Sequence, residues 1–290
     1  MEISDHFFSS NGVKLYFAET GIKNGQVIIL LHGYPESSET WRYLLPGLRD
    51  TYRIIMPDMR GYGKSDKPTG TANYDKFSMA EDLHNLTIHL GINKFILVGH
   101  DRGARTARAF ALHYPEQLIG LCFIDIVPME WIYDSMTAAD VSKKYWHWIW
   151  NLVPGQAEML LKGHEQEFLE SKFNKSPGLL EKLKREGTFG HYLDAFVSGG
   201  LEAELNDYRE TYRVDLPHYR ELRDKQIKIK IPILLLWGET GNLEGLPVME
   251  IWEKFASDIS GTEIKGCGHF VQEEKPEQVL KTLLEFIRIR

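Results

Sequence analysis

The sequence predicts an α/β fold in which a mostly parallel central sheet is flanked by helices and carries a helical lid as an insertion. Two observations support this prediction. Short apolar runs alternate with helical segments toward both ends of the chain, which is typical of parallel strands buried on both faces. Between residues 128 and 226 this alternation stops, and no convincing buried strand occurs. We therefore assign residues 1–127 and 227–290 to the core and 128–226 to the lid.

The expected elements follow in order along the chain. Two alternating runs on either side of Ser10-Asn11-Gly12 predict an N-terminal hairpin, because Asn-Gly favours a tight turn. Buried strands are expected at 27–31, 53–57, 95–99, 121–127 and 232–237. The clearest helix is SMAEDLHNLTIHLG at 78–91, which should begin with a capping box of Ser78 and Glu81 and end at Gly91.

Composition and charge exclude several classes of function. The chain is 43% hydrophobic and 26% charged, as in an ordinary globular protein, and its net charge is −7. Lys and Arg are scattered, so neither nucleic acid nor an anionic membrane is an expected partner. No apolar run approaches the ~18 residues of a membrane span, and the acidic N-terminal segment differs from a signal peptide. Cys122 and Cys267 are the two cysteines, so we expect a reducing, cytoplasmic setting without a disulfide framework.

The run FILVGHDRGARTARAFALHY predicts a buried strand, a tight turn centred on Asp101, and a helix. Gly99 and Gly103 remove side chains that would collide in such a turn, which leaves the Asp101 carboxylate projecting above the sheet. The alternative is an ordinary tight turn in which Asp101 only caps the helix. Because both the strand and the helix are present, we favour a nucleophile.

Two further segments suit the same machinery. LLHGYP at 30–35 follows a strand and would bring the Tyr34 backbone N–H beside the turn, where it and the Arg102 N–H could form an oxyanion hole. GCGHF at 266–270 places His269 in a late loop, which suits a general base. Taken alone, His269 would be an ordinary surface histidine.

The acid that orients His269 is less obvious. Glu239 and Glu244 follow the strand PILLLWG, which is the commoner place for it. Asp125 ends the apolar run LCFID, where a carboxylate is costly to bury unless a protonated imidazole pairs with it. We therefore prefer Asp125 over Glu239.

At this point the chain resembles a known family. The α/β-hydrolase pattern covers nearly its whole length, and within that fold five segments resemble the fluoroacetate (haloacetate) dehalogenases: DRGAR at 101–105, IDIVP at 124–128, YWHW at 145–148, DYR at 207–209 and GHF at 268–270. The resemblance implies a catalytic triad of Asp101, Asp125 and His269. It further implies that Arg102 and Arg105 bind the substrate carboxylate, and that the halide site consists of His147, Trp148 and Tyr208. A homodimer is also implied.

The chemistry of haloacid hydrolysis explains these residue types. A serine that attacked a saturated carbon would form an ether, whereas Asp101 forms an ester that water activated by His269 can cleave. The substrate is itself an anion, and two arginines three residues apart on the first turn of a helix can clamp its carboxylate. Hydrogen-bond donors at the halide site can take up the charge of a departing fluoride. No metal or organic cofactor is expected.

Simpler interpretations of some residues stay open. Without the resemblance, YWHWIW is more simply a lid helix that packs aromatic side chains, and Arg105 could belong to a structural ion pair. The remaining polar candidates are interpreted as structural or supporting residues: Arg108, His32, His100, Tyr145 and Tyr212.

Two other functions compete with dehalogenation. An epoxide hydrolase also uses an aspartate and a histidine, and its lid tyrosines protonate the epoxide; Tyr208 can find companions in Tyr133, Tyr145 and Tyr212. A neutral epoxide, however, gives two buried arginines nothing to pair with. A non-catalytic receptor of the same fold is the third hypothesis, and the intact triad argues against it. We therefore expect a hydrolase whose partner is a small anionic haloacid.

Overall fold

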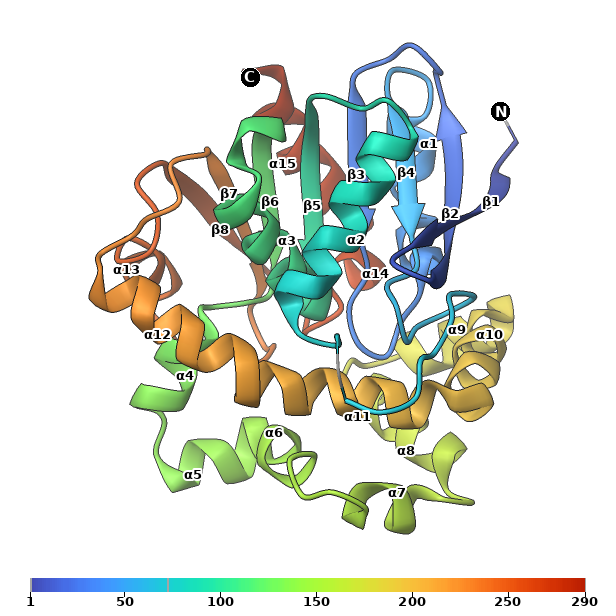
Figure 1. Ribbon diagram of the computed structural model, residues 1–290, viewed down its shortest axis with the longest axis vertical. Helices are drawn as coiled ribbons and strands as arrows, with labels where there is room; N and C mark the ends of the chain where they lie inside the picture. The colour runs from blue at the N-terminus through green and yellow to red at the C-terminus, as the bar shows by residue number, and fades with distance from the viewer. Residues whose placement is uncertain (1, 72, 290) are drawn as a thin grey trace.

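The computed structural model describes residues 2–71 and 73–289, and one eight-stranded sheet runs through it (Figure 1). The strand order is β1-β2-β4-β3-β5-β6-β7-β8. β1 (Ser4–Ser10) and β2 (Val13–Gly21) form the expected hairpin, and β2 lies antiparallel to β4 (Arg53–Pro57). The other strands are parallel: β3 (Val27–Leu31), β5 (Phe95–His100), β6 (Leu118–Ile124), β7 (Ile233–Gly238) and β8 (Ile259–Ile264). The predicted α/β sheet is therefore confirmed.

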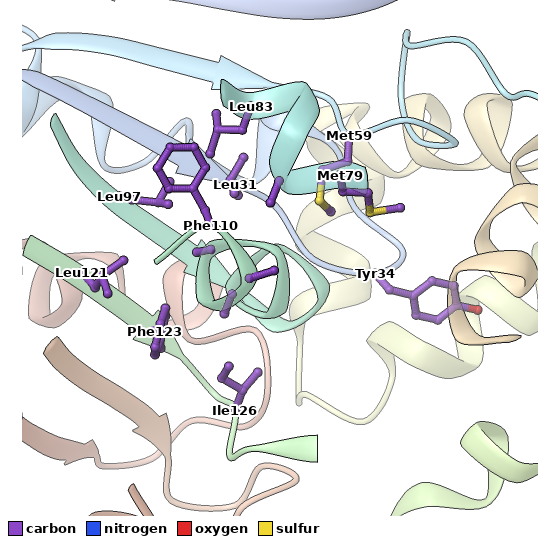
Figure 2. Close-up of a cluster of buried hydrophobic side chains, with 14 of the residues drawn as sticks. Leu31, Tyr34, Met59, Met79, Leu83, Leu97, Phe110, Leu121, Phe123 and Ile126 are labelled. Atoms are coloured by element: carbon purple, nitrogen blue, oxygen red, sulfur yellow. The ribbon is translucent and has the colours of Figure 1, made fainter. Parts of the chain in front are cut away.

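The parallel strands are buried on both faces because their side chains alternate between two hydrophobic clusters. On β3, Ile29 and Leu31 face one cluster and Ile28 and Leu30 face the other. The first face is covered by α2 (Lys76–His89), α3 (Asp101–His113) and α13 (Val248–Trp252), and Figure 2 shows α2 and α3 packed over the strands. The second face is covered by α1 (Leu45–Leu48), α14 (Val271–Glu274) and α15 (Pro276–Arg288).

Two details of the predicted elements are corrected. The capping box of Ser78 and Glu81 is wrong: α2 begins at Lys76, and the Asp75 side chain accepts hydrogen bonds from the Ser78 backbone N–H (2.9 Å) and hydroxyl (2.7 Å). The helix starts earlier because Asp75 supplies a cap acceptor one step before the buried Lys76. β8 was not foreseen, since an edge strand with mostly exposed side chains lacks the apolar run used to find the others.

The segment between β6 and β7, which contains the assigned lid, consists mainly of helices. Its α-helices are α4 (Met129–Ser135), α5 (Ala138–Asp140), α6 (Trp146–Trp150), α7 (Gln156–Leu161), α8 (Glu165–Phe173), α9 (Leu179–Glu186), α10 (Thr188–Ala195), α11 (Leu201–Glu210) and α12 (Leu216–Asp224). Wider π-helical turns join some of these helices, at Val141–Tyr145, Phe196–Gly200 and Thr211–Asp215. Outside the lid, short 3₁₀ turns lie in the core at Ser38–Trp41 and Pro115–Gln117. Figure 1 shows the lid below the sheet, facing the ends at which β3 to β7 finish. The loops that follow these strands therefore meet the lid.

Two exclusions drawn from composition can be compared with the structure. Within residues 2–71 and 73–289, no helix has both the length and the hydropathy that crossing a membrane requires. Cys122 and Cys267 are both buried and form no disulfide.

Candidate active site

Asp101 occupies a constrained turn between β5 and α3. Its φ is +42°, an uncommon value for a residue with a side chain. A Cβ on Gly99 would lie 2.6 Å from the Ala104 nitrogen, and one on Gly103 would lie 2.3 Å from the His32 carbonyl oxygen. Both positions therefore require glycine, and the turn presents the Asp101 carboxylate to a cavity between core and lid.

The structure brings the three predicted triad residues together. His269 donates from Nδ1 to Asp125 Oδ2 at 2.5 Å, and its Nε2 lies 3.9 Å from Asp101 Oδ2. Asp125 directly follows β6 with a φ of +54°, and its other oxygen accepts the Gly238 N–H at 3.1 Å. Glu239, the alternative acid, is partly exposed and accepts a hydrogen bond from Lys265 instead. The acid against His269 is thus Asp125.

Asp101 and His269 carry opposite charges. Burial opposes ionisation of Asp101, but the hydrogen bond and positive charge of His269 outweigh it and hold the Asp101 pKa far below its usual value. Burial likewise opposes protonation of His269, but its contacts with Asp101 and Asp125 raise its pKa to about 10. The resting site therefore contains an ionised nucleophile beside an imidazolium.

One of the two backbone N–H groups expected to form an oxyanion hole, that of Tyr34, contacts the Asp101 carboxylate. The Tyr34 backbone N–H donates to Asp101 Oδ2 at 3.3 Å. Arg102 is the second residue of α3, so its backbone N–H belongs to the first turn, where N–H groups lack intrahelical acceptors. Together with the positive end of the helix dipole, these groups favour negative charge on Asp101.

The two predicted carboxylate-binding arginines lie in different surroundings. Arg105 is buried and lines the cavity, one helical turn from Asp101. Its Nη1 donates to the Val127 carbonyl at 3.2 Å, and its guanidinium lies 4.7 Å from the centroid of the Trp148 ring. Among the described residues no carboxylate lies within ion-pair distance of it. Arg105 therefore has positive charge available to a ligand.

The Arg102 side chain does not reach the cavity lining. Successive residues of a helix are rotated by about 100°, so Arg102 points away from Asp101 and toward α11. There its Nε donates to Asp207 Oδ2 at 3.0 Å, and its Nη2 donates to the Asp207 carbonyl oxygen and to the Thr211 hydroxyl. The guanidinium stacks 4.4 Å from the Tyr208 ring centroid. Asp207, which also pairs with Lys76, thus compensates part of the Arg102 charge, while Arg102 Nη1 has no hydrogen-bond partner among the described residues.

The predicted halide residues gather on the lid side of the cavity. His147 and Trp148 on α6 and Tyr208 on α11 all line it, and the His147 and Tyr208 ring centroids are 5.7 Å apart. Burial, then the positive charge of Lys172, lowers the His147 pKa well below its usual value, so the ring is neutral. Burial and Asp101 raise the Tyr208 pKa, so its hydroxyl keeps its proton. His147 Nδ1 has no hydrogen-bond partner among the described residues, and the site can therefore offer donors to an anion.

Three polar residues of the cavity lining were not foreseen. Lys172 on α8, Lys175 on the following loop and Asn242 on the loop after β7 also line the cavity, and Asn242 Nδ2 lies 3.3 Å from His269 Nδ1. A signal for Lys172 exists in the sequence: it shares a helical face with Leu169 and Phe173, which are buried. A lysine on an otherwise apolar helix face indicates a candidate site residue.

Residues interpreted as supporting lie behind the site. His100 donates from Nε2 to the His269 carbonyl oxygen at 2.9 Å, and its Nδ1 lies 2.7 Å from Glu36 Oε2. Arg108 forms a buried two-point ion pair with Glu130 at 2.7 and 2.6 Å. These contacts orient the histidine loop and anchor α3 rather than reach the cavity.

The comparisons with known proteins agree with this fold. A model of the alpha/beta hydrolase fold family matches residues 26–276. A soluble epoxide hydrolase of Corynebacterium sp. (strain C12) is 29% identical over 98% of this chain and 97% of that protein. A fluoroacetate dehalogenase of a Burkholderia species is also 29% identical, over 91% of this chain and 88% of that protein. The crystal structure of Cfl2 from Burkholderia cenocepacia superposes with a TM-score of 0.86 at 30% identity, covering 98% and 95% of the two chains.

Proposed function

The chain belongs to the alpha/beta hydrolase fold family, and we propose that within this family it hydrolyses short 2-haloacids. In the proposed reaction a haloacetate and water give glycolate, a halide ion and a proton. Two relatives of equal identity carry different names, an epoxide hydrolase and a fluoroacetate dehalogenase. The choice between them must therefore rest on the chemistry of the cavity.

The observation that carries the proposal is the charge of Arg105. This guanidinium is buried, lines the cavity and has no carboxylate of its own among the described residues. A buried cation is costly unless an anion pairs with it. A haloacid supplies that anion in the substrate itself, whereas a neutral epoxide does not.

The first step would be displacement of halide by Asp101. The carboxylate is ionised, so one of its oxygens can attack the carbon that bears the halogen while the carbon–halogen bond breaks and the halide leaves with its electron pair. Arg105 would hold the substrate carboxylate and reduce its repulsion with Asp101. Tyr208, His147 and Trp148 would donate hydrogen bonds to the leaving halide.

The second step would be hydrolysis of the ester on Asp101. Esterification removes the Asp101 charge, which is one of the causes of the raised His269 pKa, so that pKa falls and the imidazole can become a base. His269 then takes a proton from water, the resulting hydroxide adds to the Asp101 carboxyl carbon, and the Tyr34 and Arg102 N–H groups hold the oxyanion. Collapse of this intermediate breaks the bond between the Asp101 carboxyl carbon and the ester oxygen, and the leaving alkoxide takes the proton of the newly formed Asp101 carboxylic acid, which gives glycolate and restores the Asp101 carboxylate. Asp125 stabilises the imidazolium.

The size of the cavity supports a small substrate. It holds about 50 Å³ of free space, whereas one water molecule needs roughly 10–15 Å³ by the same measure. Room for a few atoms suits a two- or three-carbon acid better than a long-chain epoxide.

The proposal is tested by halide release and by trapping. Wild-type protein should release fluoride or chloride from haloacetates, measured with ion-selective electrodes. His269→Asn should release about one halide per site and then stall, because nothing activates the hydrolytic water. Peptide mass spectrometry should find the carboxymethyl adduct on Asp101, and Asp101→Asn should give neither burst nor adduct. Free turnover by the His269 variant, or an adduct elsewhere, would contradict the mechanism.

A second candidate function is epoxide hydrolysis, which the facing pair of His147 and Tyr208 favours. A neutral imidazole and a protonated phenol 5.7 Å apart between ring centroids can both donate to an epoxide oxygen. A third donor is less available, because the Tyr145 hydroxyl already donates to the Asn242 carbonyl at 3.2 Å. Diol formation from small epoxides at a rate above halide release would establish this function instead.

A further inference from the structure

Lys172 is a buried lysine in the wall of the cavity. Only 7% of the residue is exposed, and it lies on the inner face of α8 between Leu169 and Phe173. Its amine is surrounded by aromatic rings, with the ring centroids of Phe168, Trp146 and Tyr34 at 4.3, 4.9 and 5.9 Å. The electron-rich faces of these rings attract a cation.

No carboxylate of the described chain forms an ion pair with Lys172. Apart from Arg105, the other well-buried cations of the described chain pair with a carboxylate: Lys76 and Arg102 with Asp207, Arg108 with Glu130, and Arg60 with Asp82. Cation–π contacts are each worth about 0.5–2 kcal/mol, which offsets only part of the cost of burying an ammonium group. The uncompensated remainder gives Lys172 a reason to bind an anion in the cavity it lines.

The position of Lys172 complements that of Arg105. Arg105 approaches the cavity from α3 in the core, and Lys172 approaches it from α8 in the lid. Arg102, the other cation expected at the substrate, is instead paired with Asp207. Among the described residues, the cavity therefore has a buried cation without a carboxylate partner on each side, and an anion between core and lid can interact with both.

We propose that Lys172 is a specificity-determining residue that binds the substrate carboxylate together with Arg105, in the place that the resemblance gave to Arg102. This inference rests on the proposed function, because it takes the ligand to be a small monocarboxylate. A point-charge ammonium accepts an anion from many directions, so Lys172 would contribute attraction while Arg105 fixes orientation. Lid and core would then close on the same anion.

The charge of Lys172 depends on pH near neutrality. Burial, and secondarily the charge of Lys175, lowers its pKa to about 7. The ammonium is therefore present below pH 7 and is lost as pH rises above it, and carboxylate affinity should fall in the same direction. The titratable groups around Lys172 are Lys175 on the next loop, His147 on α6, Tyr34 after β3, Tyr208 on α11 and, across the cavity, Asp101 and His269.

The test is calorimetric binding of glycolate and of its neutral amide, glycolamide. Lys172→Met should weaken glycolate binding at pH 6 by at least about tenfold and leave glycolamide binding unchanged. Lys172→Arg should retain glycolate binding and remove its decline between pH 6 and 9. Lys162→Met removes an exposed lysine from the same lid and should behave as wild type.

Three outcomes overturn the inference: glycolate does not bind wild-type protein, Lys172→Met binds it unchanged, or the variant loses glycolate and glycolamide affinity equally. Binding does not require the reaction, so the two proposals can fail separately. If glycolate binding depends on Lys172 but no haloacid releases halide, the proposed function fails and the anion site stands. If halide is released but Lys172→Met binds glycolate normally, only this inference fails.

Discussion

Asp101 is ionised in a buried cavity, and in the proposed reaction a second anion approaches it. His269 supplies one compensating charge and Arg105 another, both among the causes that lower the Asp101 pKa. The acid partner Asp125 is fixed by the Gly238 N–H, so the imidazole keeps one orientation. At the scale of single residues, the chemistry of the site depends on which charges are paired within the protein and which remain free to bind a ligand.

Arg105→Leu should discriminate between charged and neutral substrates. Loss of a buried charge partner costs about 2–5 kcal/mol, so kcat/KM for chloroacetate should fall by about 30-fold or more. Chloroacetamide, which has no charge to lose, should change far less. Arg185→Leu, at an exposed position on α9, is the control and should retain wild-type rates. Equal losses on acid and amide would show that Arg105 only shapes the cavity.

Tyr208→Phe should distinguish a halide site from a packing role. Fluoride depends most on hydrogen bonding as it leaves, so the variant should lose more activity on fluoroacetate than on chloroacetate or bromoacetate. Initial rates of halide release across the three acids provide the measurement. A uniform loss across the halides would mean that the Tyr208 hydroxyl does not stabilise the leaving group.

The strand–turn–helix element of β5 and α3 holds Asp101 in a constrained backbone conformation that directs its carboxylate into the cavity. Its glycines are required by contacts with backbone atoms, which cannot move aside as a flexible side chain can. The element also supplies the helix N-terminus and presents Arg105 one turn after the nucleophile. Strain at Asp101 is held by packing of α3 against the sheet.

Gly103→Ala should damage both stability and activity. The added methyl would lie 2.3 Å from the His32 carbonyl oxygen and 2.4 Å from that of Leu31, and such overpacking costs about 1–3 kcal/mol. Urea unfolding and halide release should both report the loss. Gly190→Ala on α10, where an added Cβ meets nothing within 4 Å, should be neutral or stabilising. Similar behaviour of the two variants would refute the packing argument for the turn.

Across the whole molecule, the lid is joined to the core by a buried charge cluster. Asp207 on α11 accepts from Arg102 on α3, from Lys76 on α2 and, at 2.8 Å, from the Tyr62 hydroxyl. Burial opposes ionisation of Asp207, but the two cations hold its pKa below the usual value. Because α11 also presents Tyr208, this cluster fixes the lid side of the cavity relative to the nucleophile.

Asp207→Ala should therefore destabilise the protein strongly. The substitution leaves two buried cations without their partner, which costs about 3–5 kcal/mol, measurable as a lower midpoint in denaturant unfolding. Glu39→Ala is the control: it removes an exposed core–lid ion pair to His191 at 2.8 Å and should cost less than about 1 kcal/mol. If both substitutions cost equally little, the buried cluster does not hold the lid.

The sequence by itself determined most of the strands and the tight turn that presents the Asp101 carboxylate, because each is encoded by neighbouring residues. Continuous apolar runs mark strands buried on both faces, and two glycines around Asp101 mark a turn that tolerates no side chains. The edge strand β8 and the true cap of α2 escaped because neither has a distinctive local pattern. The pattern of neighbouring residues was sufficient to predict those features that neighbouring residues encode.

Only the tertiary structure decided which charges meet. The choice of Asp125 over Glu239 depends on where two loops converge across the sheet. The pairing of Arg102 with Asp207, 105 residues away, and the entry of Lys172 into the cavity depend on how the lid packs on the core. Which charges compensate one another depends on the distances between them in the folded protein, whereas a sequence gives only their separation along the chain.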